Sequence, residues 1–203
     1  MALVPFDALR QTVAPTAEPI LLDEAKSHLR IRTSDTVQDS YIETLLIPRA
    51  RKIAEDFQHR AYITQTWVLN LDCFPACGEI LLPRPPLQSV SSIVYTLEDG
   101  TTGTVSSSDY VVDAFSEPGR ILLKGGEAWP TDTLRVGPSV AVTFVAGYGA
   151  AGSSVPGEIR QAILLILSHL FENREAVVDQ SRGSLSPLPM GVETLLMNDR
   201  FFA

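Results

Sequence analysis

The period of the sequence changes at Thr64-Gln65-Thr66-Trp67-Val68-Leu69-Asn70-Leu71, where polar and apolar residues begin to alternate. Alternation with a period of two is typical of a half-buried strand, and it places Trp67, Leu69 and Leu71 on one face. The residues before this stretch follow the three- and four-residue spacing of helices instead. The change therefore predicts a β-rich segment that begins near residue 61.

Further strands are expected after this one, at residues 78–82, 90–96, 110–113, 120–123 and 140–146. Glu98-Asp99-Gly100 and Pro118-Gly119 are typical turn sequences between them. Pro83-Arg84-Pro85-Pro86 cannot donate hydrogen bonds to a sheet and should form a stiff edge connection. About six short strands separated by turns predict a small antiparallel barrel or sandwich over residues 61–154.

Helical patterns precede and follow this β-rich segment. Acidic residues at the start and basic residues at the end of 22–31 favour a short helix. A second helix is expected to bend near Thr44 to Pro48, because proline removes a backbone donor. Its apolar stripe comprises Ile42, Leu45, Leu46, Ala50, Ile53, Ala54 and Phe57. A third helix, the longest and most apolar, should run from about 157 to 175 after Pro156.

These patterns predict an α+β fold. Its frame is a helical bundle of the N-terminal helices and the long C-terminal helix, made from residues 20–60 and 155–178, into which the β-rich segment 61–154 is inserted. Residues 1–19 and 179–203 lack a sustained period and are expected to be extended arms. The glycine- and serine-rich stretch 147–154 is the expected hinge back to helix.

The balance of charge excludes several classes of protein. The 203 residues contain 16 Lys and Arg and 24 Asp and Glu, giving a net charge of −8, which disfavours a protein that binds by neutralising many phosphates. No apolar run approaches the roughly 18 to 20 residues that span a bilayer, and the start does not resemble a secretory signal. The chain is expected to stay in the cytoplasm unless carried out, with its two cysteines reduced.

Candidate catalytic residues are few. The three histidines, His28, His59 and His169, are expected to be structural or surface residues. Cys73 and Cys77 have a spacing compatible with a metal, but zinc needs about four ligands and no second pair follows. We therefore predict no catalytic, metal or cofactor site.

Other charged or glycine-rich stretches also have ordinary explanations. The paired carboxylates Glu98-Asp99 and Glu172 with Glu175 fall on a turn and a helix end, where solvated charge is the norm. The glycines of 147–152 lack the lysine of a phosphate-binding loop. The basic cluster of Arg49, Arg51 and Lys52 is followed by Glu55 and Asp56, with which it can pair along a helix.

The C-terminal arm ends in large apolar residues after a polar spacer. Such residues either fold back on the core or fill a groove on another protein, and the spacer favours the second. The docking candidates are Leu185, Leu188, Val192, Leu195, Leu196, Met197, Phe201 and Phe202.

The order of several motifs resembles a known family, the head-to-tail connector (adaptor) proteins of long-tailed bacteriophages, prophages and gene transfer agents. The similarity covers roughly residues 18–178, with a weaker continuation at 188–192, and no single motif decides it. In chain order the motifs are Glu18-Pro19-Ile20-Leu21-Leu22-Asp23-Glu24-Ala25-Lys26-Ser27-His28-Leu29-Arg30, Ile63-Thr64-Gln65-Thr66-Trp67, Leu82 to Val90, Ser116-Glu117-Pro118-Gly119-Arg120-Ile121, Trp129-Pro130, Phe144 to Gly149, and Val155-Pro156 through Ile159-Arg160-Gln161-Ala162-Ile163 to Glu172-Asn173-Arg174-Glu175. Pro48 and the two cysteines are not part of the pattern.

The resemblance implies a virion structural protein without enzymatic activity. Such proteins form a ring, commonly of twelve subunits, between the portal protein and the next neck or tail-completion protein, and DNA passes through the ring. They are found in the virion neck, and in the host cytoplasm during assembly, without a membrane partner. Alternatives are another neck or tail protein, such as a stopper or tail terminator, and a small hydrolase that uses the acidic β-rich segment.

Overall fold

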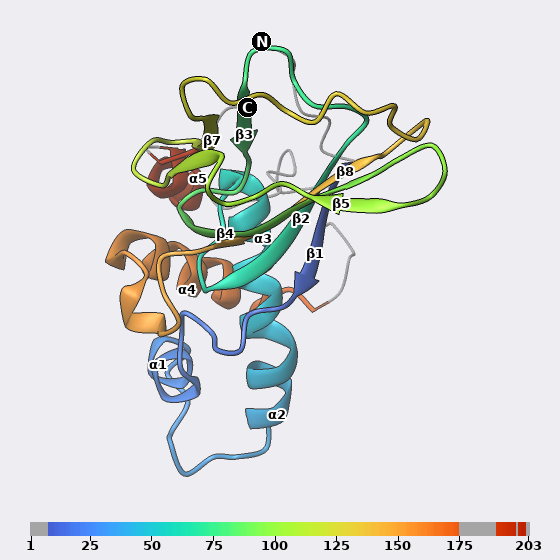
Figure 1. Ribbon diagram of the computed structural model, residues 1–203. Coiled ribbons are helices and arrows are strands. Elements are labelled where there is room, and N and C mark those ends of the chain that lie inside the picture. Colours follow the sequence, from blue (N-terminus) through green and yellow to red (C-terminus); the bar gives the residue numbers. More distant parts are fainter. Residues whose placement is uncertain (1–7, 175–189, 198, 202–203) are drawn as a thin grey trace, which may run out of the picture. The chain divides into compact units, whose positions relative to one another are not determined.

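A computed structural model describes residues 8–174, 190–197 and 199–201. The chain divides into two compact units (Figure 1). The sheet unit comprises Met1–Thr16, Thr64–Tyr148 and Phe201–Ala203, and the helical unit comprises Ala17–Ile63 and Gly149–Arg200. The expected α+β class is confirmed. Each helix that the structure describes is too short or too polar to cross a membrane.

The helical unit contains five α-helices, one π-helix and one short 3₁₀-helix among its described residues. Only α3 and α4 exceed two turns by a clear margin, although α2, the π-helix and α3 follow one another without a break from residue 39 to residue 58. The expected helical bundle frame is not confirmed. The elements are α1 (Leu22–His28), α2 (Asp39–Tyr41), the π-helix η2 (Ile42–Leu46), α3 (Ile47–Gln58), the 3₁₀-helix η3 (Gly152–Ser154), α4 (Gly157–Glu172) and α5 (Met190–Met197).

The irregularity expected near Pro48 is a π-helical segment. The π-helix η2 occupies residues 42–46, and Pro48 lies in the first turn of α3. Proline has no backbone hydrogen to donate to the carbonyl four residues before it, and its ring crowds that carbonyl, so a regular α-helix cannot continue through this point. The wider π turn lets the helix resume beyond the proline.

The π-helix also changes which residues of α3 are buried. An extra residue per turn rotates the following face, so Leu45, expected inside, is half exposed, while Ile47, Arg51, Glu55 and Gln58 are buried. The apolar members of this face pack against α4. They are Ile42, Leu46, Ile47, Ala50 and Ala54, and α4 contributes Ile159, Ala162, Ile163, Ile166 and Leu167. Four members of the expected stripe, Ile42, Leu46, Ala50 and Ala54, are therefore buried as expected, whereas Leu45, Ile53 and Phe57 are not fully buried.

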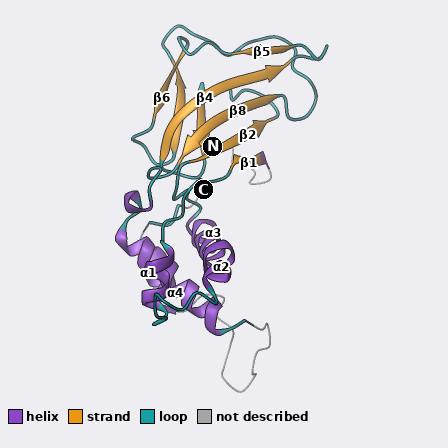
Figure 2. Cartoon of the chain, turned by 90° about the horizontal axis from the view of Figure 1, so that it is seen from below, coloured by secondary structure: helices purple, strands orange, loops and turns teal. Residues whose placement is uncertain are grey.

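The sheet unit is built from two antiparallel sheets. The first has the order β1-β2-β8-β4-β5 and the second the order β3-β7-β6; Figure 2 shows β1, β2, β8 and β4 side by side. The strands are β1 (Leu9–Val13), β2 (Gln65–Leu71), β3 (Glu79–Leu82), β4 (Leu87–Thr96), β5 (Thr102–Thr104), β6 (Tyr110–Asp113), β7 (Gly119–Leu123) and β8 (Val140–Ala146). The expected barrel is not confirmed, because neither sheet closes on itself.

The two sheets face each other across an apolar core. On β2 and β8, Trp67, Leu69, Val142 and Phe144 are buried on one face, as the alternation predicted, while Leu71 is half exposed. The sheets approach closely at Gly119 of β7, where an added Cβ would lie 2.5 Å from the Cβ of Leu87 on β4. Any side chain at Gly119 would therefore push the sheets apart.

Two strands escaped the sequence patterns. Residues 1–19 were expected to be an arm without secondary structure, but Leu9–Val13 form β1 and pair with β2. β5 pairs with β4 across the expected Glu98-Asp99-Gly100 turn. Both strands are short and half exposed, and each is stabilised by its neighbour in the sheet rather than by its own sequence.

Lys26 of α1 fixes the loop between α1 and α2. Its side chain is only 2% exposed, and its Nζ donates to Asp39 Oδ1 at 2.7 Å and to the carbonyl oxygens of Thr33 at 3.1 Å and Asp35 at 2.7 Å. All three ammonium hydrogens thus have acceptors. A buried charge with this many partners makes the loop part of the packed unit.

We predict that Lys26→Met destabilises the protein by about 3 to 5 kcal/mol, because it leaves Asp39 without its buried cation. Lys52→Met is the matched control: Lys52 forms a 2.8 Å ion pair with Asp56, but both side chains are about half exposed. Such a pair contributes about 1 kcal/mol or less. Urea unfolding of the two variants measures the difference, and equal effects would contradict the role given to Lys26.

Candidate interaction surfaces

The C-terminal docking candidates lie on and around α5, which packs against α3 and α4 within the helical unit. Val192 and Leu196 are fully buried, Leu195 is half buried, and Met197 is 52% exposed. Phe201 is half buried and belongs to the sheet unit. Leu185, Leu188 and Phe202 lie outside the described residues. One face of α5 is thus part of the chain's own core, and the opposite face reaches the surface.

Side chains at the end of α3 hold the end of α5. Gln58 is fully buried; its Nε2 donates to the Leu196 carbonyl at 2.9 Å, and its Oε1 accepts from the Tyr62 hydroxyl at 2.5 Å. Arg60 donates to the Asp199 carbonyl, and the Arg200 guanidinium lies 4.7 Å from the ring centre of Phe57. The last carbonyls of a helix have no partners within it. Here Gln58, the last residue of α3, supplies one for the Leu196 carbonyl.

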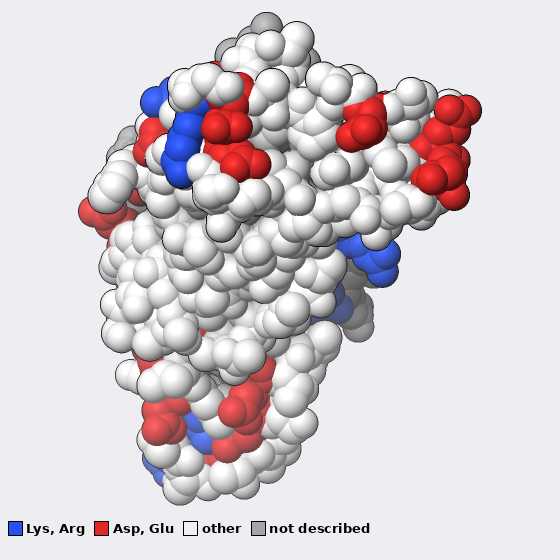
Figure 3. All heavy atoms as spheres, in the orientation of Figure 1, with Lys and Arg blue, Asp and Glu red and all other residues white. Residues whose placement is uncertain are grey.

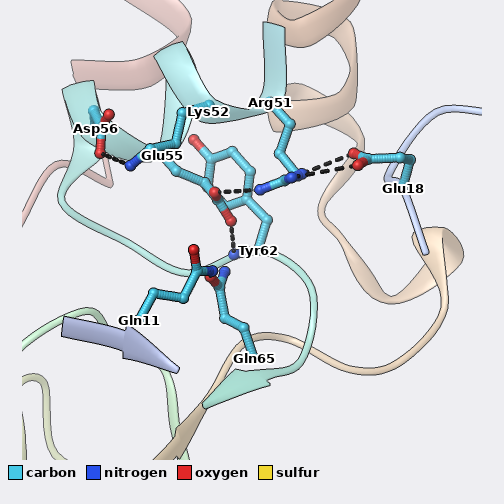
Figure 4. A network of polar contacts seen from close by, with 8 residues as sticks. All are labelled: Gln11, Glu18, Arg51, Lys52, Glu55, Asp56, Tyr62 and Gln65. Atoms are coloured by element: carbon cyan, nitrogen blue, oxygen red, sulfur yellow. Dashed lines mark hydrogen bonds and ion pairs between the residues drawn. The ribbon is translucent and has the colours of Figure 1, made fainter. Parts of the chain in front are cut away.

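A polar network runs along the buried face of α3 (Figure 4). Arg51 donates from Nε to Glu18 Oε2 and from Nη1 to Glu55 Oε2, each at 2.7 Å. Glu55 Oε1 accepts the backbone N–H of Tyr62 at 2.9 Å. Burial lowers the pKa of Arg51, but the hydrogen bonds and charges of Glu18 and Glu55 outweigh burial and raise that pKa above its ordinary value. The network joins Glu18, α3 and Tyr62.

Figure 4 also shows two polar pairs with other settings. Lys52 and Asp56 pair on the exposed side of α3, four residues apart as the sequence predicted for this basic cluster. In the sheet unit, the Gln11 side chain of β1 donates to Gln65 Oε1 of β2. Gln65 is fully buried, so this bond ties the edge strand to its neighbour.

A second surface is formed by the turn between β6 and β7 in the sheet unit. Phe115 in this turn is 100% exposed. The preceding Asp113 accepts four hydrogen bonds, from the backbone N–H groups of Phe115 and Ser116, the Ser116 hydroxyl and Arg120 Nε. The sequence motif Ser116 to Ile121 was singled out, but Phe115 and Asp113 were not. The available sequence signal was Asp113 two residues before Phe115, since an aspartate often accepts the backbone N–H two residues on.

The remaining candidates do not converge on a chemical site. Cys73 and Cys77 are exposed free thiols, His59 ends α3 with a left-handed backbone, and His169 lies beside Asn173. Glu98 and Asp99 line an open hollow with Leu97, Asp132 and Thr133. Among the described residues, no group of three or more His, Cys, Asp and Glu side chains could hold a metal ion.

The glycine- and serine-rich stretch 147–154, the expected hinge, lies where the chain passes from the sheet unit to the helical unit. Residues 147–152 cross the boundary between the two units, which falls between Tyr148 and Gly149. Gly147 has a φ of 133°, a conformation that side chains rarely adopt, and its N–H donates to the Pro86 carbonyl at 2.9 Å. Glycine at position 147 therefore allows a backbone conformation that the chain needs where it leaves the sheet unit.

A comparison with models of known protein families found no match, and a comparison with curated proteins found none either. Solved structures do match. The chain is similar to a chain in the neck of an empty gene transfer agent particle computed with sixfold symmetry, with 22% identity, a TM-score of 0.78 and 96% of both chains covered.

Two further structures match over the same share of both chains. One is the virion of a native gene transfer agent particle, with 21% identity and a TM-score of 0.76. The other is the neck of a native particle computed with twelvefold symmetry, with 24% identity and a TM-score of 0.71. The coverage of 96% in each direction includes both units, so the chain has the same fold as chains that occur in gene transfer agent particles.

Proposed function

We propose that this protein is a head-to-tail connector, or adaptor, in the neck of a phage-like particle. The observation that carries the proposal is the match of fold over 96% of both chains to chains of gene transfer agent necks. The order of sequence motifs from Glu18 to Glu175, which resembles connector proteins of long-tailed phages, supports it independently. The proposed role is structural, without a catalytic step or a cofactor.

The proposed assembly is a ring, with twelve copies as the expected number. A closed ring of identical subunits needs a heterologous interface, in which one face of a subunit meets a different face of the next. The twelvefold and sixfold symmetries of the neck structures that share this fold are compatible with such a ring. The portal protein is the proposed partner on one side, and the next neck or tail-completion protein on the other.

DNA is proposed to pass through the ring without being held there. The sheet unit contains 5 Lys and Arg and 10 Asp and Glu, a formal charge of −5, and acidic side chains dominate the charged residues visible on it in Figure 3. Carboxylates repel the phosphate backbone over about a Debye length, ~10 Å at moderate salt. A surface of this sign favours transit over capture. The proposed location is the virion neck, after assembly in the host cytoplasm.

The C-terminal candidates remain the proposed contact with the portal. In the conformation described above, Val192 and Leu196 hold α5 to the chain's own helices, while Met197 and part of Leu195 are accessible. Met197 and Leu195 are therefore the residues of α5 that we propose make the first contact. An unbranched methionine adapts well to an irregular apolar groove.

The first test is imaging of particles produced by the cells that encode this chain. Peptide mass spectrometry of purified particles should find the chain, and cryo-electron microscopy of the neck should show a ring of its copies directly against the portal. A position elsewhere in the tail would favour a stopper or terminator role. Absence of the chain from tailed particles would refute the proposed function.

The second test concerns docking. Met197→Ser should weaken binding to the purified portal protein about tenfold, equivalent to about 1.4 kcal/mol, because a thioether that becomes buried in the proposed complex is replaced by a hydroxyl. Val13→Ser on β1 is the control, since Val13 is 53% exposed and Met197 52%. Both variants should unfold at the temperature of the unmodified protein. An unchanged portal affinity for Met197→Ser would remove α5 from the interface.

A further inference from the structure

The three-stranded sheet has an outward face that carries apolar side chains. Cross-strand pairing places Val111 beside Leu122, and Leu122 beside Glu79; the next row contains Asp113, Arg120 and Leu81. Val111 is 48% exposed, and Leu81 and Leu122 are half exposed, whereas Ile80, Leu82 and Ile121 point to the buried face. Three apolar side chains thus share a solvent-facing surface beside the β6–β7 turn.

Phe115 is a further exposed apolar residue in the β6–β7 turn, two residues after Asp113 of this sheet face. Its side chain is 100% exposed, so its whole apolar area is available to a partner. Burial of apolar area contributes about 25 cal/mol per Å², and a phenylalanine buries on the order of 150 Å² or more. Single exposed apolar residues are common, but this one lies in the turn that directly joins two strands of this sheet face, β6 and β7.

Asp113 holds the turn in one conformation. Its Oδ1 accepts the N–H groups of Phe115 and Ser116, each at 3.1 Å, and its Oδ2 accepts the Ser116 hydroxyl at 2.7 Å and Arg120 Nε at 2.9 Å. Arg120 Nη1 also donates to Glu79 Oε1 at 3.2 Å, which connects the turn to β3. A backbone ordered before binding loses less entropy when a partner arrives.

We propose that Phe115 and the face formed by Val111, Leu122 and Leu81 bind a second protein of the particle, at an apolar pocket rimmed by lysine or arginine side chains. The setting, a particle neck, rests on the proposed function. The charge of the partner follows from the formal charge of −5 on the sheet unit and from this face, where Glu79 and Asp113 share one cation, Arg120. A second copy of the sheet unit, itself at −5, would bring charge of the same sign.

Photo-crosslinking in assembled particles tests this proposal. Phe115 is replaced by the photoreactive residue p-benzoylphenylalanine, which keeps an aromatic ring at this position, and Val136, 96% exposed on the β7–β8 connection, is replaced in the same way as a control. Light should crosslink position 115 to a different particle protein, at an apolar segment containing lysine or arginine, and position 136 should give no such product.

Each other outcome overturns the proposal. Crosslinks from position 115 to a second copy, to a segment without basic residues, or to nothing would each refute it while leaving the chain in the neck. If particles lack the chain altogether, the proposed function falls and this inference falls with it. The two failures are therefore distinguishable by mass spectrometry of the same sample.

The affinity for the crosslinked protein, once purified, provides the second measurement. Phe115→Ala should reduce it at least tenfold and Val136→Ala less than twofold, with both variants unfolding at the temperature of the parent, since neither side chain is packed. Equal affinities for Phe115→Ala and the parent would contradict an anchoring role.

Asp113 is a positioning residue in this proposal, and pH provides its test. Hydrogen bonds from Ser116 and then Arg120 lower the pKa of Asp113 well below that of an ordinary aspartate. The charged carboxylate therefore supports the turn at all pH values above about 3.9, the ordinary value, and support is lost only as pH falls through the lowered value.

Removing one donor should shift that profile. Ser116→Ala should raise the pKa of Asp113, and nuclear magnetic resonance of the Asp113 carboxyl carbon should detect titration at a higher pH than in the parent. The affinity for the partner should begin to fall at a correspondingly higher pH. A binding profile identical to that of the parent would mean that Asp113 does not position Phe115.

Discussion

Arg51 and Glu55 form an ion pair in the interior of the helical unit, and the other contacts of that unit depend on it. Two charges can be buried only if each finds further partners; Glu18 supplies the second carboxylate for Arg51, and the Tyr62 N–H the second donor for Glu55. Removal of any member leaves a buried charge or donor unsatisfied. The segment before α1, the helix α3 and the chain leaving α3 are therefore fixed together.

This polar face exists because of the π-helix before it. Without the extra residue of η2, the helical stripe would place Ile53 and Phe57 inside and leave Arg51, Glu55 and Gln58 at the surface. With it, Gln58 reaches the interior and binds the carbonyl of Leu196. The π-helix thus helps to decide where α5 packs on α3. The packing of α5 in turn decides which of its side chains are accessible, although α5 lies more than a hundred residues further along the sequence.

The two proposed contacts differ in how they are prepared. Met197 lies on a helix held by core packing on its opposite face, whereas Phe115 lies on a turn held by four hydrogen bonds to one carboxylate. Each contact is ordered before a partner arrives, which limits the entropy lost on binding. They belong to separate units, and under the proposed function each would bind a different neighbour.

Local pattern was enough to predict the α+β class, six of the strands, the helices 22–28 and 157–172, and an irregularity at Pro48, because periodicity and proline act over a few residues. It could not predict β1, whose partner β2 lies more than fifty residues away, nor the register shift that buries Arg51 and Glu55. The sequence pattern identified the apolar C-terminal residues, but it could not tell which of them are buried. It also did not identify Phe115 as an exposed residue. Exposure and burial are properties of the packed chain, and long-range contacts decide them.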